Sequence, residues 1–394
     1  MFKQTGAITL MNLRSLPQRA GMSLATVLSI ALVVGVLLGF LAMANGFQKT
    51  VNGTGSEDVA VLLRGGSQAE LNSVLTADQL RVLETAPGIA TDADGNPLIS
   101  GELYVVVDAV KKDLGTEANL PMRGVSLQAP QLRGQFEMIA GRMFEPGTNE
   151  IVVGQAVLNA FEGFELGHTI RLGSNEWNVV GIFSTGGTVF ESEAWAEIGV
   201  VQNLYQRGSS LQSIRAKLTS AEAISELEAF AAEDPRLNEL DIMNELDFYA
   251  GQSGTLTQII RFVGWPLAIT MAIGAFAGAW NTMYSSVDAR MREIATLRAI
   301  GFSGAAAATG TMIESLVLSA LGGLIGTAAI YLMFNGASAS ALGSGFTQVV
   351  FSFAVTGQSV IAGMAMAVII GFLGGLVPAI RSASIPLLTV HRSA

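Results

Sequence analysis

The segment AGMSLATVLSIALVVGVLLGFLAMANGFQ, residues 20–48, contains no aspartate, glutamate, lysine or arginine. A helix needs about 20 mostly apolar residues to cross the hydrocarbon core of a bilayer. Two other segments are equally free of charge, one between Arg261 and Asp288 and one between Glu314 and Arg381. The second of these holds parts of two helices, separated by the small, polar stretch NGASASALGSGFTQ. The sequence therefore predicts four transmembrane helices, at about 22–46, 260–285, 307–334 and 354–379.

The composition of the whole chain is typical of a membrane protein. Half of the 394 residues are hydrophobic and 14% are charged, and the mean hydropathy is +0.47. A soluble domain carries about 25% charged residues. The leading residues 1–21 mix apolar with polar and basic side chains. We interpret them as a cytoplasmic amphipathic segment at the membrane interface, with a disordered tail as the alternative.

The charged residues divide the chain into an acidic middle and basic flanks. Residues 47–261 hold 29 acidic and 14 basic residues, whereas the remainder holds 3 acidic and 8 basic ones. Lysine and arginine near helix ends mark the cytoplasmic side of a membrane. They precede the first span, separate the second from the third, and occur in the tail as Arg381 and Arg392. This pattern predicts cytoplasmic termini and an acidic outer domain at 47–258, whose charge argues against a nucleic-acid partner.

The outer domain alternates short strand-like and helix-like patterns. Valine-rich segments at 58–64, 102–110 and 150–154 predict strands. The stretch HTIRLGSNEWNVVGIF, residues 168–183, predicts a hairpin, and a helix is predicted at 76–88, where Thr76 can cap its start. We expect an α+β domain, large enough for a hydrophobic core of its own. It must hold together without disulfides, since the chain has no cysteine.

The sequence offers no catalytic constellation. None of the five lysines follows a glycine, so the phosphate-binding pattern Gly-x-x-x-x-Gly-Lys-Ser/Thr does not occur. With two histidines and no cysteine, no His/Cys metal site can form. The acidic pairs Glu191 with Glu193 and Glu226 with Glu228 are interpreted as solvated faces. We therefore expect no catalytic residue, no metal and no cofactor in this chain.

Each predicted span carries the pattern Gly-x-x-x-Gly. Glycines four apart form a flat strip on one helix face, so that another backbone can approach closely. The pattern predicts tight helix packing within a dimer, although glycine is also simply frequent in membrane helices. The pairs are Gly35 with Gly39, Gly274 with Gly278, Gly322 with Gly326, and Gly371 with Gly375.

The charged stretch RMREIATLRAIGFS, residues 290–303, lies between the second and third predicted spans. Met291, Ile294 and Leu297 recur at the spacing of one helix face, which predicts a short amphipathic helix at about 288–302. Such a helix serves either as a positive-inside topology anchor or as a docking surface for a cytoplasmic partner. A much shorter connection would suffice for topology, and this favours docking.

Local signals mark both ends of this helix. Arg290 and Glu293 lie three residues apart and can pair. Gly301 is placed to end the helix, and Ser303 can cap the next one. The candidate docking residues are Arg290, Arg292, Glu293, Leu297, Arg298 and Gly301.

Glu314 is the charged residue of the third predicted span. A carboxylate at membrane depth is costly and marks a functional site by default. It lies about two turns from the cytoplasmic end of the span, within reach of Arg298 or of a docked partner. The alternative is a carboxylate near the headgroups that faces the positive end of the helix dipole.

These motifs resemble those of the FtsX-like and MacB-like ABC permeases. In that family the connection between the second and third spans reads Arg-x-x-Glu-Ile-x-x-Leu-Arg-Ala-(Ile/Leu)-Gly-(Ala/Phe)-Ser, which this chain matches from Arg290 to Ser303. The segment GGLVPAIRSASIPLLTVHR is similar to the end of the family's fourth span, and GRMFEPGTNEIVVGQAVLNAF to its outer domain. The resemblance covers essentially the whole chain, with one span before the outer domain and three after it.

The resemblance implies a permease subunit of an ABC transporter in a bacterial inner membrane. In the family, the helix between the second and third spans sits in a groove of a separate cytoplasmic ATPase, which binds ATP and Mg²⁺. Two permeases and two ATPases form the complex, and closure of the ATPases moves the helices and the outer domains. A second copy of this chain is favoured over a paralogue as the second permease. Further expected partners are membrane lipids and a periplasmic adaptor or acceptor.

Three functions are compatible with the sequence. Export or extraction of lipid-linked or periplasmic cargo, as in MacB-like and lipoprotein-releasing permeases, is favoured. An FtsX-like transmitter that switches an extracytoplasmic hydrolase without transport is the alternative, and the large outer domain argues against it. A membrane receptor or scaffold is the third possibility, and the signature at 290–303 argues against it. The sequence does not identify a cargo.

Overall fold

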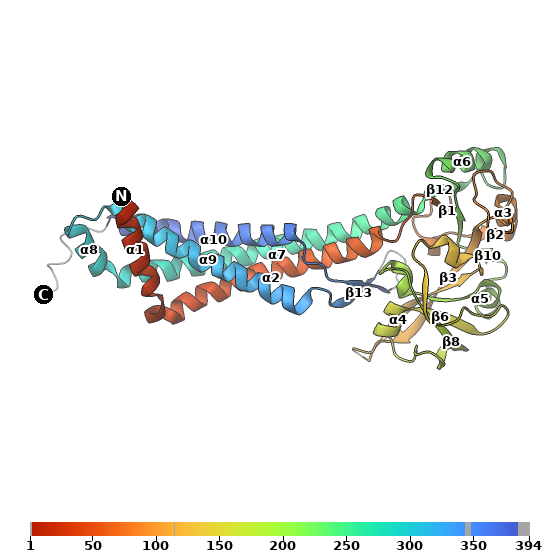
Figure 1. The fold of residues 1–394 in the computed structure, drawn as a ribbon, viewed down its shortest axis with the longest axis horizontal. Coiled ribbons are helices and arrows are strands. Elements are labelled where there is room, and N and C mark those ends of the chain that lie inside the picture. The colour runs from red at the N-terminus through yellow and green to blue at the C-terminus, as the bar shows by residue number, and fades with distance from the viewer. Residues whose placement is uncertain (1, 114, 343–347, 385–394) are drawn as a thin grey trace. The chain divides into compact units, whose positions relative to one another are not determined.

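The computed structural model describes residues 2–113, 115–342 and 348–384, so Arg392 of the predicted basic tail lies outside the described residues. The chain divides into two units (Figure 1). The helical unit comprises Met1–Asn45, Gln258–Ala337 and Phe353–Ala394. The β-domain comprises Gly46–Thr257 and Ser338–Ser352. It therefore includes a segment from between the last two spans, in addition to the region that the sequence predicts.

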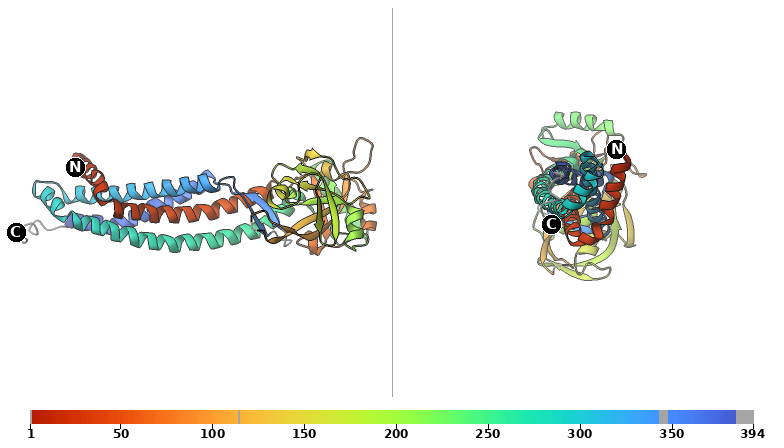
Figure 2. Two further views of the ribbon diagram at one scale, coloured as in Figure 1. Left: turned by 90° about the horizontal axis from the view of Figure 1, so that it is seen from below. Right: turned by 90° about the vertical axis from the view of Figure 1, so that its left-hand side faces the viewer.

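Four helices in the described part of the chain are long and apolar enough to cross a membrane. Three of them contain a predicted span, and the fourth, α10, begins three residues after the predicted start of its span at 354. The helices α2 and α7 also continue into the β-domain. Within the helical unit these helices run alongside one another, as both views of Figure 2 show. The bounds are Ala20–Asn52 for α2, Glu245–Ala289 for α7, Gly304–Phe334 for α9 and Gly357–Ser384 for α10.

The glycine pair of α9 brings this helix into close contact with α2. A Cβ atom added at Gly322 would lie 2.8 Å from the carbonyl oxygen of Val27. A Cβ atom at Gly326 would lie 2.4 Å from the carbonyl oxygen of Ala31. Because both distances are far below a van der Waals contact, a side chain at either position would push the two helices apart.

The glycine pair of α10 faces α9 in the same way. A Cβ atom added at Gly371 would lie 2.1 Å from Oγ of Ser319, and one at Gly375 would lie 2.7 Å from Cβ of Ser315. Gly371 and Gly375 are thus covered by a helix of the same chain. The Gly-x-x-x-Gly pattern predicts either packing within a dimer or merely the high glycine content of membrane helices, whereas in the structure α9 occupies this strip, since the two serines are small enough to fit against the glycines.

The other glycine pairs have open surroundings. A Cβ atom added at Gly39, Gly274 or Gly278 would meet nothing within 4 Å among the described residues, and one at Gly35 would be in ordinary contact with Ile330. Packing within this chain therefore accounts for the pairs on α9 and α10. It leaves the pair on α7 with an uncovered strip, and the role of that strip in a dimer stays a prediction.

The first residues of the chain form a packed helix. Helix α1 (Phe2–Arg14) is followed by the 3₁₀ turn η1 (Leu16–Arg19). Ile8 is buried, and its side chain lies so close to Gly310 of α9 that a Cβ atom there would approach it to 2.7 Å. In the structure, α1 is thus part of the helical unit, which removes the alternative of a disordered tail.

The β-domain is α+β, as the sequence predicts. Its main sheet has the strand order β12-β1-β11-β3-β4-β9-β6-β8-β5, with β7 paired to β8. The pairs β4/β9 and β6/β8 are parallel and the others are antiparallel. The strands of this sheet are β1 (Val59–Arg64), β3 (Ile99–Val110), β4 (Glu117–Val125), β5 (Glu137–Gly141), β6 (Glu150–Gly154), β7 (Thr169–Leu172), β8 (Asn175–Ser184), β9 (Ala194–Glu197), β11 (Ser213–Lys217) and β12 (Leu240–Asn244).

Short helices connect the strands where the local sequence supports them. Thr76 accepts a hydrogen bond from the backbone N–H of Gln79, whose side chain accepts one from the N–H of Thr76. This capping box confirms the predicted helix start. The pairing of β7 with β8 likewise confirms the hairpin predicted at 168–183. The remaining elements are β2 (Leu75–Thr76), β10 (Ser210–Leu211), α3 (Ala77–Leu83), α4 (Gln155–Ala160), α5 (Ile198–Leu204), α6 (Ile224–Glu233), η2 (Glu70–Asn72), η3 (Ala129–Leu132), η4 (Val189–Ser192) and η5 (Ala221–Ala223).

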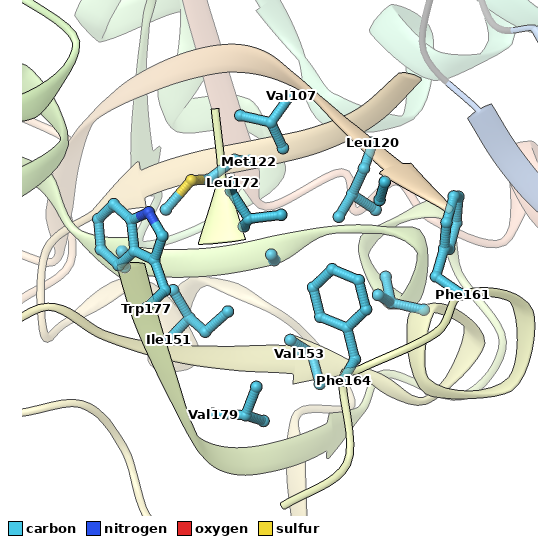
Figure 3. Packing of buried hydrophobic residues seen from close by; sticks show 14 of the residues in the cluster. Val107, Leu120, Met122, Ile151, Val153, Phe161, Phe164, Leu172, Trp177 and Val179 are labelled. Atoms are coloured by element: carbon cyan, nitrogen blue, oxygen red, sulfur yellow. The ribbon is translucent and has the colours of Figure 1, made fainter. Parts of the chain in front are cut away.

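Apolar residues from the main sheet and its helices form a dense core. Figure 3 shows its centre, where Val107, Leu120 and Met122 face Trp177 and Phe164. The two aromatic side chains are fully buried. A buried side chain of this size contributes about 1.5–3 kcal/mol to folding, so the domain can be stable without disulfides.

A hairpin from between α9 and α10 completes the β-domain. It consists of β13 (Ser338–Leu342) and β14 (Gln348–Ser352). The ring of Phe351 is buried edge-on against Phe47, with ring centroids 5.6 Å apart, and the N–H of Val350 donates to Oγ of Ser192 at 2.9 Å. The resemblance to the FtsX-like permeases implies a permease domain at 259–394, in which this stretch is the small, polar separator between the third and fourth spans. The apolar residues of β14 attach it to the β-domain instead.

Candidate functional site

The charged stretch between the second and third spans forms helix α8 (Met291–Ala299). Gly301 follows it with φ of +104°, a left-handed conformation that lets the chain leave a helix without strain. Ser303 then caps α9 by accepting a hydrogen bond from the N–H of Ala306 at 3.2 Å. The local sequence thus creates a short helix with defined ends between two long ones.

Helix α8 has one buried and one exposed side. Ile294 and Ala295 are buried in an apolar cluster with residues of α7 and α9. Arg292 and Glu293 lie on the exposed side, and Ile300, just after the helix, is 70% exposed. The candidate docking residues Leu297 and Arg298 lie between these sides and are half-buried.

Arg290 immediately precedes α8 and is buried, so it does not belong to the exposed side of the helix. The residue is only 5% exposed. Its Nη2 atom donates to Oε2 of Glu314 at 2.7 Å and to Oγ of Ser286 at 3.0 Å, and Nη1 donates to Oδ1 of Asn12 at 2.6 Å. The guanidinium therefore points toward Glu314, and the expected pair with Glu293 is replaced by a buried one.

Glu314 is held by a second arginine. The carboxylate is 1% exposed, and Nη2 of Arg19 lies 3.3 Å from its Oε1. Arg19 also donates to Ser286 and, at 2.8 Å, to Oγ of Ser15. A buried carboxylate is tolerated only when it is paired and hydrogen-bonded, and here two guanidinium groups satisfy it. The sequence places Arg298 or a docked partner within reach of Glu314, whereas in the structure Arg290 and Arg19 bind it.

These side chains form one unit, which we call the Glu314 cluster. It joins α1, η1, the end of α7, the start of α8 and α9. The contributions of the N-terminal segment and of α7 are not evident from the sequence. The sequence does contain one signal for them: an acid inside an apolar span needs cations at the same membrane depth, and Arg19 and Arg290 stand at the ends of neighbouring spans. The members of the cluster are Asn12, Arg19, Ser286, Arg290 and Glu314.

Helix α1 also contacts the other end of α8. Nε2 of Gln4 donates to the carbonyl oxygen of Gly301 at 3.3 Å, and its Oε1 accepts from the N–H of Ser303 at 3.5 Å. Asn12 of the same helix accepts a hydrogen bond from Arg290, the residue before α8. Both ends of α8 are therefore attached to α1, and the residues that precede the first span become part of the site.

A second buried ionic cluster lies in the β-domain. Arg123 of β4 donates to both carboxylate oxygens of Glu193 at 2.7 Å, and its Nη1 lies 2.9 Å from Oε2 of Glu102 on β3. Glu102 also accepts from Arg133 at 2.7 Å and from Arg215 at 3.0 Å. Burial raises the pKa of the Glu102 carboxyl, but the three arginines outweigh this effect and hold its pKa below the ordinary value.

The same cluster reaches the first turn of α7. Arg215 donates to Oε1 of Glu245 at 2.5 Å and to Oε1 of Glu70 at 2.9 Å. Burial raises the pKa of the Glu70 carboxyl, but Arg123 and Arg215 outweigh this effect and hold its pKa well below the ordinary value. Long-range ion pairs thus connect α7 to the main sheet.

The interpretation of Glu191 and Glu193 as a solvated pair is wrong. Both residues are buried. Glu193 binds Arg123, and Oε1 of Glu191 accepts from the N–H groups of Thr185 and Gly187. Two acids that alternate along the chain look like one exposed face of a strand. The cation that pairs with Glu193 comes from a distant part of the sequence, so the local pattern does not reveal the burial.

Comparison with known proteins follows the division of the fold. Residues 23–232 match the MacB-like periplasmic core domain, and residues 266–387 match the FtsX-like permease C-terminal domain. The chain belongs to the FtsX-like, MacB-like ABC permease family. This confirms the resemblance read from the motif at 290–303 and the architecture of one span, a large domain and three further spans. As a member of this permease family with four apolar helices, the chain is an inner-membrane protein.

Relatives of this permease include two kinds of transport protein. The macrolide export ATP-binding/permease protein MacB of Neisseria gonorrhoeae is 22% identical over 92% of this chain and 57% of its own length. The lipoprotein-releasing system transmembrane protein LolC of Neisseria meningitidis is 26% identical over 84% of this chain and 80% of its own. A crystal structure of the periplasmic region of MacB from Actinobacillus actinomycetemcomitans matches 55% of this permease and 97% of that chain, at 17% identity and a TM-score of 0.39. The chain spans about half the length of the MacB relatives that it matches.

Proposed function

We propose that this chain is the transmembrane subunit of an ABC transporter, in which a separate ATPase drives movement of the β-domain to export or extract lipid-linked or periplasmic cargo. The observation that carries the proposal is the position of Arg290. This residue joins the start of α8, a helix with an exposed charged side, to Glu314 inside the helical unit.

The exposed side of α8 is the proposed contact with the ATPase. Arg292, Glu293 and Ile300 combine both charges with an accessible apolar side chain, which suits a groove on another protein. The buried side chains of Ile294 and Ala295 hold the helix against α7 and α9 at the same time. A partner that grips α8 therefore grips the helical unit.

The Glu314 cluster transmits this movement in the proposed mechanism. Removing one partner of a buried ion pair costs about 3–5 kcal/mol, because the other charge is left unpaired. Displacing the start of α8 without α9 would separate Arg290 from Glu314. Moving both together preserves the pair, so a push on α8 becomes a movement of α9 and, through Arg19, of the segment that leads into α2.

The remaining parts of the complex follow from this assignment. We propose that α8 and both termini lie in the cytoplasm and that ATP and Mg²⁺ bind to two ATPase subunits. The second permease is a further copy of this chain. Relatives named for lipoprotein release and for macrolide export support transport over mere switching of a hydrolase. A periplasmic adaptor or acceptor would receive the cargo, and lipids surround the four spans.

Charge reversal on α8 tests the docking role. The permease is purified with the ATPase from its host, and the variant Arg292→Glu/Arg298→Glu is compared with the parent. We expect at least a tenfold loss of affinity for the ATPase and a matching loss of stimulated ATP hydrolysis. Arg290 is left intact because reversing a charge beside Glu314 would disturb the fold itself.

The matched control reverses two exposed arginines of the β-domain, Arg171→Glu/Arg207→Glu. It changes the net charge equally and should leave ATPase binding unchanged. Full binding and activity of the α8 variant would refute the proposal. Mass spectrometry of lipids and proteins that copurify with the parent complex then distinguishes transport from regulation of a cell-wall hydrolase.

A further inference from the structure

One short segment of the β-domain is buried along its whole length. It comprises η4 and the residue after it, Val189–Glu193, and we call it the junction segment. Each of its five residues is at most 8% exposed. A segment enclosed in this way has little freedom to move independently of its neighbours, because protein interiors are packed like solids.

Two parts of the β-domain from which the chain continues into the helical unit form hydrogen bonds with the junction segment. Thr54, the second residue after the end of α2, accepts a hydrogen bond from the N–H of Val189 at 2.9 Å. Ser192, at the other end of η4, accepts one from the N–H of Val350 in β14 at 2.9 Å. The chain passes from Thr54 back into α2 and from the β13–β14 hairpin into α9 and α10.

The third connection, α7, attaches through an aromatic side chain. The ring of Phe190 lies edge-on to that of Tyr249 in the second turn of α7, with centroids 5.9 Å apart. Guanidinium groups surround the same ring, with Arg133 at 4.1 Å and Arg215 at 5.5 Å from its centroid. Arg215 in turn binds Glu245, the first residue of α7. Phe190 is thus fixed to α7 by an aromatic contact and by cation–π contacts.

On its other side the junction segment is fixed to the main sheet. A Cβ atom added at Gly154, at the end of β6, would lie 2.1 Å from the carbonyl oxygen of Glu191. The N–H of Gly154 donates to the carbonyl oxygen of Glu193 at 3.0 Å, and the Glu193 side chain binds Arg123 of β4. Backbone contact and a buried ion pair therefore join the segment to two strands.

We propose that the junction segment passes the movement of the membrane helices to the main sheet, with Phe190 as its positioning residue. The β-domain is linked along the chain to the helical unit by α2, by α7 and by the β13–β14 hairpin. The segment that follows α2, helix α7 and strand β14 of the hairpin contact these five residues, which contact β4 and β6 in turn. The inference rests on the proposed function and adds the place where driven motion enters the β-domain.

Spin labelling of the full complex tests this inference. The chain has no cysteine, so Val74→Cys in the β-domain and Ile361→Cys on α10, both at exposed positions, give one defined label pair. The permease is reconstituted with its ATPase in lipid nanodiscs. Label distances are measured by pulsed electron paramagnetic resonance without nucleotide and after trapping with ATP, Mg²⁺ and vanadate.

In the labelled parent we expect a nucleotide-dependent shift of the distance distribution. Phe190→Ala should reduce this shift by at least half, while ATPase affinity stays within twofold of the parent. Phe164→Ala is the matched control, because it removes an equally buried ring from the core in Figure 3, away from the junction segment. It should leave the shift intact.

Ser192→Ala keeps the inference testable if Phe190→Ala does not fold. It removes only the acceptor for Val350 and should also reduce the shift. A distance shift of full size in Phe190→Ala would overturn the inference. If Phe190→Ala does not fold, a full shift in Ser192→Ala would overturn it. A reduction of the shift in Phe164→Ala as large as in Phe190→Ala would overturn it as well. A labelled parent that binds no ATPase or shows no nucleotide-dependent shift would instead refute the proposed function.

Discussion

Nη2 of Arg290 lies 2.7 Å from Oε2 of Glu314, although the two residues are 24 positions apart in the sequence. Both side chains are buried. Arg290 immediately precedes α8, and Glu314 lies in the third turn of α9. The pair therefore links the start of α8 to the third membrane span.

Neutralising the acid of this pair is the first test of its role. Glu314→Gln leaves the buried Arg290 and the half-buried Arg19 without their shared counter-charge, and we expect a loss of about 3–5 kcal/mol in stability. Thermal unfolding of the purified permease in detergent measures this loss. Glu293→Gln, on the exposed side of α8, is the control and should change the melting temperature very little.

Replacing both partners by apolar residues separates stability from coupling. Well-packed apolar substitutes for a buried ion pair are often neutral or stabilising, so Arg290→Met/Glu314→Met should recover the stability that Glu314→Gln loses at Arg290, while Arg19 keeps its hydrogen bonds to Ser15 and Ser286. ATP hydrolysis by the bound ATPase should then no longer drive the distance change between labels at Val74→Cys and Ile361→Cys. A double variant that folds and still shows the full change would mean that the ion pair is structural only.

The glycine pairs predict opposite outcomes on different helices. Gly326→Leu places a side chain where the Ala31 carbonyl lies 2.4 Å from a Cβ atom, and overpacking of this kind costs about 1–3 kcal/mol or more. We expect a lower melting temperature. Gly274→Leu enters open space and should leave the melting temperature unchanged while lowering the dimer fraction measured by light scattering. An unchanged dimer fraction would remove α7 from the predicted dimer contact.

The buried carboxylates predict a loss of stability in acid. Glu70 and Glu102 have folded-state pKa values below the value of about 4.3 of an unfolded chain. Their contribution is complete above that pH and is lost as the pH falls through the lower folded-state values. The free energy of unfolding of the β-domain should therefore decrease below about pH 4, as measured by fluorescence of the buried Trp195.

An exposed carboxylate provides the control for this pH dependence. The ammonium of Lys112 holds the pKa of the Glu165 carboxyl at about 2. Because this pair is open to solvent, water and salt screen it. Glu165→Gln should leave the acid profile unchanged, whereas Glu102→Gln should flatten it and lower stability at neutral pH. Identical profiles for Glu102→Gln and the parent would contradict the assignment.

Local patterns in the sequence predict the helices and their ends. Charge-free runs mark the spans because lipid excludes charge, and Thr76, Gly301 and Ser303 mark helix boundaries because capping involves neighbours only a few residues away. These interactions are local, and a single sequence is enough to identify them. The motif at 290–303 additionally predicts the family.

The partners of buried charges depend on the tertiary fold and escape such patterns. Glu193 lies 70 residues from Arg123, and Glu314 lies 295 residues from Arg19. The alternation of Glu191 with Glu193 suggests exposure, since nothing nearby in the sequence announces their cations. Arg19 is visible only as a topology signal, although its position at the membrane boundary also suits it to meet an acid in a neighbouring span.

The glycine strips show the same division between local and tertiary information. The spacing of Gly371 and Gly375 identifies a face that a neighbour can approach closely, because that property belongs to one helix. Which helix covers the face depends on the arrangement of all four spans. The structure places Ser315 and Ser319 of α9 there, and no pattern within α10 announces them.

The β13–β14 hairpin has a consequence for biosynthesis. The ribosome makes Phe47 and Ser192 long before it makes Val350 and Phe351, and α7, α8 and α9 are translated in between. The β-domain therefore acquires its last strands only after the third span has been made. A nascent chain whose third span fails to insert in the correct direction would leave Phe47 without its contact to Phe351, so completion of the β-domain depends on correct insertion of that span.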